Sequence, residues 1–137
     1  MSDIIDLWPE LKVEKIRSPR TILKEQADLL GKKTNNILLG EVEFRNYESS
    51  EFSYNNSTED DGYIYFSFKV KAPNFGGYTY TLFSGRYNAI GFYPILIYGK
   101  EVNNEKDFLS LIKEKFNSPD TLRIINALYS QSIDEDN

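Results

Sequence analysis

The chain has no cysteine and no histidine among its 137 residues. Without cysteine there is no disulfide framework and no thiolate chemistry. This fits a reducing compartment, and we expect a cytoplasmic protein. Without histidine the chain lacks the commonest general base near neutral pH and the commonest metal ligand, which excludes an ordinary structural zinc site. Together the two absences favour a protein that is not an enzyme.

Several signals that accompany other functions are also missing. No apolar run approaches 18 residues and the N-terminus is not basic and then apolar, so we expect neither a membrane span nor a signal peptide. No Gly-x-Ser-x-Gly turn, Gly-rich phosphate loop or calcium loop occurs. Glu41 and Glu43 supply two carboxylates of the kind a two-metal nuclease uses, but Arg45 replaces the expected lysine. We therefore expect no cofactor and no bound metal.

The net charge is −5, with 16 basic and 21 acidic residues that are unevenly distributed. Residues 37–72 and 103–137 are acidic, whereas residues 1–36 are nearly balanced. No Lys/Arg stripe is present, so binding to duplex nucleic acid is not expected. The acidity indicates either solubility alone or a surface that meets a basic protein partner.

Residues 62–84 (GYIYFSFKVKAPNFGGYTYTLFS) predict a β-hairpin around which the rest of the chain is organised. Side chains alternate between the two faces of a strand, and every second residue from Ile64 to Ala72 is apolar. This series marks the core face. The Pro, Asn and Gly residues at 73–77 are typical of a turn.

The register of the hairpin follows from the same alternation. Pairing the strands across Phe75 places Phe68 opposite Leu82 and assigns Phe83 to the outward face. The core face of the second strand then consists of Tyr78, Tyr80 and Leu82.

The flanking segments predict helices and two more strands. Ser18-Pro19 and Ser118-Pro119 each provide an N-cap followed by proline at the first helical position, and Asn103 or Asn104 caps a third helix. Residues 37–47 predict a strand. Residues 92–102 predict another, which is apolar on both sides.

The expected fold class is therefore α+β: a four-stranded antiparallel β-meander with one N-terminal helix and two C-terminal helices packed on it. Residues 1–137 form a single domain with an arm at 1–17, a polar loop at 48–61 and a frayed acidic tail at 132–137. Within the arm, which we expect to be short helical or extended, Trp8 either pins the arm to the body or anchors a partner.

The outward face of the hairpin is the candidate binding surface, because aromatic and charged residues alternate there. Glu41 and Glu43 of the preceding strand are expected to pair with Lys69 and Lys71. Arg86, in the connector after the hairpin, could receive an anion. The candidate binding residues are Tyr63, Tyr65, Lys69, Lys71, Phe83, Arg86, Glu41 and Glu43.

Three functions fit these features. The first is a small acidic, non-enzymatic binding protein of inhibitor, immunity or regulatory type that engages a basic protein partner. The second is a ligand- or nucleotide-binding domain, with or without enzymatic activity, whose sheet-face pocket contains Arg86, Lys69, Lys71 and tyrosines. The third is a subunit of a larger assembly, with the arm around Trp8 as its interface.

Overall fold

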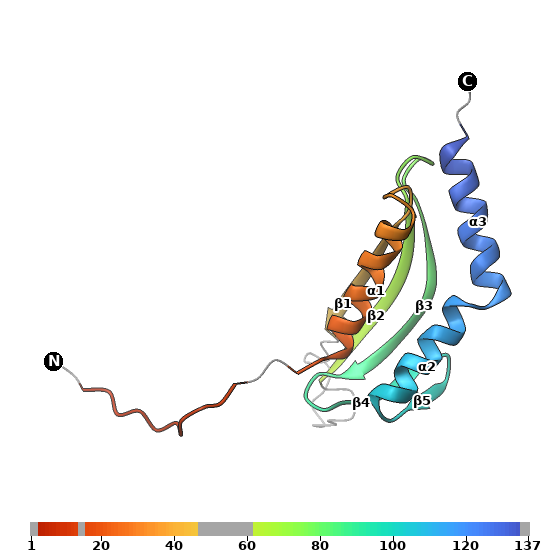
Figure 1. The fold of residues 1–137 in the computed structure, drawn as a ribbon. Coiled ribbons are helices and arrows are strands. Elements are labelled where there is room, and N and C mark those ends of the chain that lie inside the picture. Colours follow the sequence, from red (N-terminus) through yellow and green to blue (C-terminus); the bar gives the residue numbers. More distant parts are fainter. Residues whose placement is uncertain (1–2, 14–15, 47–61, 135–137) are drawn as a thin grey trace, which may run out of the picture.

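The computed structural model describes residues 3–13, 16–46 and 62–134. Its order is α1 (Pro19–Lys33), β1 (Leu39–Asn46), β2 (Tyr63–Ala72), β3 (Tyr78–Asn88), β4 (Phe92–Ile97), β5 (Lys100–Val102), α2 (Glu105–Phe116) and α3 (Pro119–Ile133). The five strands form one antiparallel meander in the order β1-β2-β3-β4-β5 (Figure 1). The expected α+β class is confirmed. Among the described residues, no helix is both long and apolar enough to cross a bilayer.

The sheet has five strands rather than four, because the segment predicted as one strand turns at Tyr98-Gly99. Both residues have positive φ, 55° and 76°, which is the combination that a tight two-residue hairpin turn requires. Gly99 adopts this conformation without a side-chain penalty. The chain therefore folds back, and Lys100–Val102 pairs with Ile95–Ile97.

The helix starts agree with their capping residues. The Ser18 and Ser118 hydroxyls accept hydrogen bonds from the backbone N–H of Thr21 and Thr121, and the Asn104 side chain accepts one from Asp107. Helix α1 ends at Lys33, and Asn35 and Asn36, which follow it, both have positive φ. Helix α3 runs to Ile133, beyond the start of the predicted tail. The predicted loop at 48–61 lies outside the described residues.

A β-bulge divides the central hairpin into two registers. Lys69 pairs with Thr81 as the alternation predicts, but Phe68 pairs with Phe83, so Leu82 is the extra residue of β3. The predicted pairing of Phe68 with Leu82 is therefore wrong. Beyond the bulge, Phe83 points into the core and lies 3% exposed.

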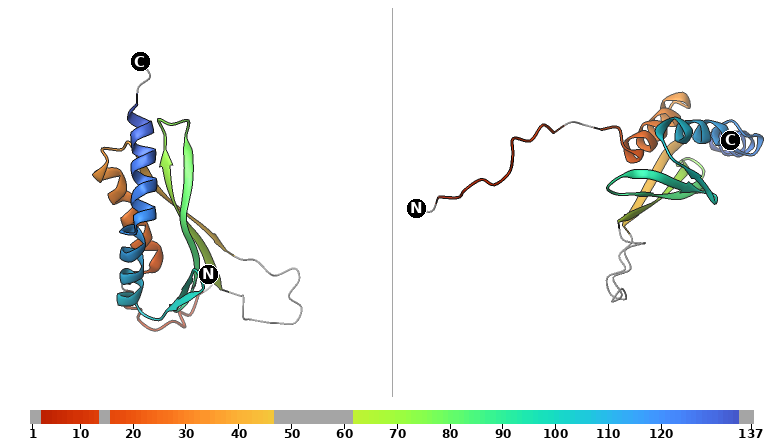
Figure 2. Two further views of the ribbon diagram at one scale, coloured as in Figure 1. Left: turned by 90° about the vertical axis from the view of Figure 1, so that its right-hand side faces the viewer. Right: turned by 90° about the horizontal axis from the view of Figure 1, so that it is seen from below.

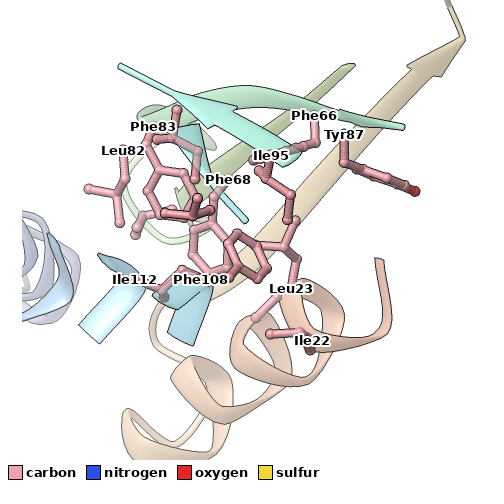
Figure 3. Packing of buried hydrophobic residues seen from close by; sticks show 14 of the residues in the cluster. Ile22, Leu23, Phe66, Phe68, Leu82, Phe83, Tyr87, Ile95, Phe108 and Ile112 are labelled. Atoms are coloured by element: carbon pink, nitrogen blue, oxygen red, sulfur yellow. The ribbon is translucent and has the colours of Figure 1, made fainter. Parts of the chain in front are cut away.

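All three helices cover one face of the sheet, so the molecule has two layers (Figure 2). The core lies between them, and Figure 3 shows Phe68 and Phe83 packed with Leu23 of α1 and Ile112 of α2. Phe68 and Phe83 are stacked with ring centroids 5.3 Å apart. Tyr78 and Tyr80 are on the core side of β3 as predicted, but they remain exposed because the end of the hairpin is only partly covered.

Candidate partner-binding surfaces

The sheet face opposite the helices is not covered by any described helix, and we call it the open sheet face. The strand register shows which side chains lie next to one another across this face. Arg45, Tyr65 and Arg86 lie side by side across β1, β2 and β3, and the next row contains Glu43, Ser67 and Ser84. The open sheet face consists of Glu41, Glu43, Arg45, Tyr63, Tyr65, Ser67, Lys69, Lys71, Thr79, Thr81, Ser84 and Arg86.

Two ion pairs connect β1 to β2 on this face. The Lys69 Nζ lies 2.9 Å from a carboxylate oxygen of Glu43, and the Lys71 Nζ lies 3.8 Å from one of Glu41. The expected Glu–Lys pairing is therefore confirmed. Because each lysine is matched by a carboxylate, these four residues contribute no net charge to the open sheet face.

Arg86 lies within β3 and not in a connector after the hairpin as expected, because β3 continues to Asn88. It is held among tyrosines. Its guanidinium carbon lies 4.3 Å from the ring centroid of Tyr63, a cation–π contact, and its Nη1 lies 3.4 Å from the Tyr65 hydroxyl, to which it donates. The Ser67 and Ser84 hydroxyls share a hydrogen bond of 3.0 Å in the adjacent row. The half-buried tyrosines thus hold the arginine against the sheet.

A hollow of about 510 Å³ lies beside this arginine. Arg45, Tyr65 and Arg86 line one part of it, and the Tyr98-Gly99 turn lines another. Lys69 and Lys71 do not line it, since they lie further along β2 in contact with the glutamates. Two guanidinium groups and two serine hydroxyls are donors suited to an anion. The Glu43 carboxylate also lines the hollow and is held in its ion pair with Lys69.

Seven of the eight candidate binding residues lie on the open sheet face, and Phe83 does not. The bulge at Leu82 rotates Phe83 to the core side, so it cannot contact a partner at this surface. Arg45 and Ser84 were missed as candidates. Arg45 was identifiable because it continues the alternation of Glu41 and Glu43.

The two tyrosines with shifted pKa values lie on the core side. Burial raises the pKa of Tyr87, while the nearby Arg20 guanidinium opposes that shift. Burial also raises the pKa of Tyr93, and the Glu105 carboxylate adds to the shift. Among the described residues no group of three or more His, Cys, Asp or Glu side chains is placed to hold a metal ion.

The N-terminal arm is a second surface. Residues 3–13 have no helix or strand and lead away from the body (Figure 1). Trp8 is 74% exposed, so it does not pin the arm to the body. The exposed apolar residues of residues 3–13 and 16–17 are Ile4, Ile5, Leu7, Trp8, Leu11, Val13 and Ile16.

No protein-family model, curated protein or solved structure matches the chain. Functional inference therefore depends on the two surfaces themselves.

Proposed function

We propose that the protein is a small, non-enzymatic binding protein of inhibitor, immunity or regulatory type that engages a protein partner with a basic surface. The observation that carries this proposal is the sheet face opposite the helices, which no described helix covers. Tyrosine and arginine are the residue types that contribute most often to binding energy at protein interfaces. Here Arg86 already contacts both Tyr63 and Tyr65, so little side-chain entropy is lost when a partner binds.

The net charge of the whole chain supports a basic partner. The net charge of −5 attracts a basic protein over long distances and raises the rate of encounter. On the open sheet face itself, Arg45 and Arg86 are in excess over the two balanced Glu–Lys pairs, so the long-range attraction comes from the rest of the chain. At this face a partner that carries lysine or arginine can exchange the intramolecular pairs of Glu41 and Glu43 for intermolecular ones.

Retention of a host protein on immobilised wild-type and variant chains tests the proposal. Thr81→Arg places a long charged side chain in the middle of the open sheet face, where Thr81 is exposed. Ser110→Arg adds the same charge to an exposed position of α2 and is the matched control. We expect wild type and Ser110→Arg to retain one protein at low salt, and Thr81→Arg to lose it.

High salt should release the retained protein, because screening weakens contacts between exposed charges. Equal retention by Thr81→Arg and wild type would show that the open sheet face is not the binding surface. Retention that does not depend on salt would contradict a basic partner.

A second candidate function, binding of a small anionic ligand, is supported by the hollow between Arg45, Arg86 and the Tyr98-Gly99 turn. Thermal-shift measurements with nucleotides and inorganic phosphate test it. A ligand at 100 times its dissociation constant adds about 2.7 kcal/mol to the free energy of unfolding. Arg45→Ala should abolish that shift, and no shift across the panel would contradict this function.

A further inference from the structure

An apolar groove runs between α1 and α3 on the helical side of the molecule, away from the open sheet face. Phe68, Leu82 and Phe116 lie at its base, and its volume is about 430 Å³. The walls come from the second half of α1 and the first half of α3. Two of their leucines are left partly in solvent: Leu29 is 40% exposed and Leu122 is 48% exposed. Exposed apolar surface of this kind marks an interaction site.

The charge of this groove suits an acidic apolar segment. Lys33 is the one charged residue among those that line it, and no carboxylate is among them. The described arm, residues 3–13, contains Asp3, Asp6 and Glu10 against one lysine, Lys12. The other residues of the arm are apolar, and its net charge is opposite to that of the groove.

The apolar side chains of the arm are arranged around a bend at Trp8, whose backbone N–H donates a hydrogen bond of 3.1 Å to the Asp6 carboxylate. Ile4, Ile5 and Leu7 precede the bend, and Leu11 and Val13 follow it, all of them exposed. Trp8 is the largest side chain available and is typical of an interface anchor.

In the structure the arm does not lie in the groove of its own chain. The Arg17 guanidinium forms ion pairs with Glu25 of α1 at 2.9 Å and with Glu105 of α2 at 3.5 Å. These contacts fix the chain at the start of α1, and the groove lies toward the opposite end of that helix. Residues 3–13 lead away from the body, as Figure 1 and the right-hand view of Figure 2 show.

We infer that two copies of the chain exchange arms, so that residues 3–13 of each copy occupy the α1–α3 groove of the other. Such an exchange obeys twofold symmetry, in which the same two surfaces meet twice. It buries both apolar surfaces that the isolated chain leaves in water. The inference is independent of the partner proposed for the open sheet face, which the exchange leaves uncovered.

Sedimentation of the full chain over a wide range of protein concentrations tests this exchange. We expect a dimer whose dissociation constant rises at least about tenfold in Trp8→Ala and in Leu122→Lys. Leu109→Lys is the matched control, because Leu109 is 37% exposed on α2 and does not line the groove. That variant should dimerise as wild type does. Trp8→Ala cannot disturb the fold, since Trp8 lies outside the core.

Mixing the two defective variants gives a further check. The Leu122→Lys copy has an intact arm and the Trp8→Ala copy has an intact groove, so one arm–groove contact can form and association should partly recover. Trp8 is the only tryptophan, and its emission should shift to shorter wavelength as wild type dimerises.

Several results would overturn the exchange. The first is that the wild-type chain is a monomer at every concentration. This result counts against the exchange both when Trp8 fluoresces as an exposed tryptophan and when it fluoresces as a buried one, because a buried Trp8 in a monomer would occupy the groove of its own chain. Another is a dimer that persists in either groove or arm variant. A dimer lost equally in Leu109→Lys would also overturn it.

Discussion

Gly40 of β1 lies directly against the backbone of Ala27 in α1. A Cβ atom built on Gly40 would stand 2.5 Å from the Ala27 Cα and 2.6 Å from its carbonyl oxygen. Only a residue without a side chain permits this approach. The contact brings α1 onto the first strand and thereby fixes which face of the sheet the helix covers.

Gly40→Ala should therefore destabilise the protein by about 1–3 kcal/mol or more, because overpacking against backbone cannot be relieved by a rotamer change. Urea unfolding measures the loss. Gly91→Ala is the control, since its Cβ would come no closer than 3.9 Å to any neighbour and φ at Gly91 is not in the left-handed region. A loss of equal size in both variants would mean that the contact with Ala27 is not the cause.

Phe83→Ala should destabilise the fold by about 3–5 kcal/mol, because it leaves a cavity next to Phe68 and Phe116. Phe75→Ala, in the exposed turn of the hairpin, should cost far less. Thermal or urea unfolding distinguishes the two. If Phe83→Ala remained as stable as wild type and instead lost partner binding, the assignment of Phe83 to the core would be wrong.

Tyr93→Phe should raise the free energy of unfolding at neutral pH by about 1 kcal/mol, because the Tyr93 hydroxyl is buried without a hydrogen-bond partner among the described residues. Chemical denaturation of the two proteins measures the difference. A clear loss of stability would show that the hydroxyl makes a favourable interaction.

The raised pKa of Tyr93 also predicts the behaviour at alkaline pH. The unfolded state releases the phenolic proton near the ordinary pKa of 10.0, while the folded state retains it to higher pH. The unfolded state then binds fewer protons, so the free energy of unfolding falls as pH rises above 10.0. The fall should be smaller in Tyr93→Phe. Tyr87→Phe should reduce it as well, because the pKa of Tyr87 is raised too. Unchanged pH profiles in both variants would contradict these shifts.

A double-mutant cycle on Lys69 and Glu43 should give a coupling of about 0.2–1 kcal/mol, the range of cross-strand charge pairs. Their atoms approach to 2.9 Å, whereas those of Lys71 and Glu41 are 3.8 Å apart. The second pair should therefore couple more weakly. Addition of salt should reduce both couplings. A coupling indistinguishable from zero for Lys69 and Glu43 would show that the two charges do not stabilise the fold by interacting with each other.

Local chemistry predicted where the helices start and which residues of the hairpin share a face. A serine followed by proline is typical of a helix N-terminus, and apolar residues at every second position indicate a strand with one buried face. The bulge could not be predicted in this way. Leu82 and Phe83 are adjacent and both apolar, and strict alternation can bury only one of them, whereas the bulge buries both. One bulged residue therefore moved Phe83 from the candidate binding face to the core.

The candidate surfaces were predicted less completely than the fold. Alternation placed Tyr65, Lys69 and Glu43 correctly on one face, but it cannot show which face the helices cover. That choice depends on close packing such as the contact between Gly40 and Ala27. The exposure of Trp8 was equally out of reach, since an apolar arm looks the same in sequence whether or not it folds back on the body.

The Tyr98 hydroxyl donates a hydrogen bond of 2.6 Å to the carbonyl oxygen of Leu82. The extra residue of β3 and the positive-φ turn after β4 are thus joined by one side chain, and each irregularity depends on the other. Tyr98→Phe would leave the bulge carbonyl without this donor, and deletion of Leu82 would leave the tyrosine without its acceptor. Anyone who transplants the β4–β5 hairpin to another scaffold, or trims β3 to a regular strand, would have to move or redesign both positions as a unit.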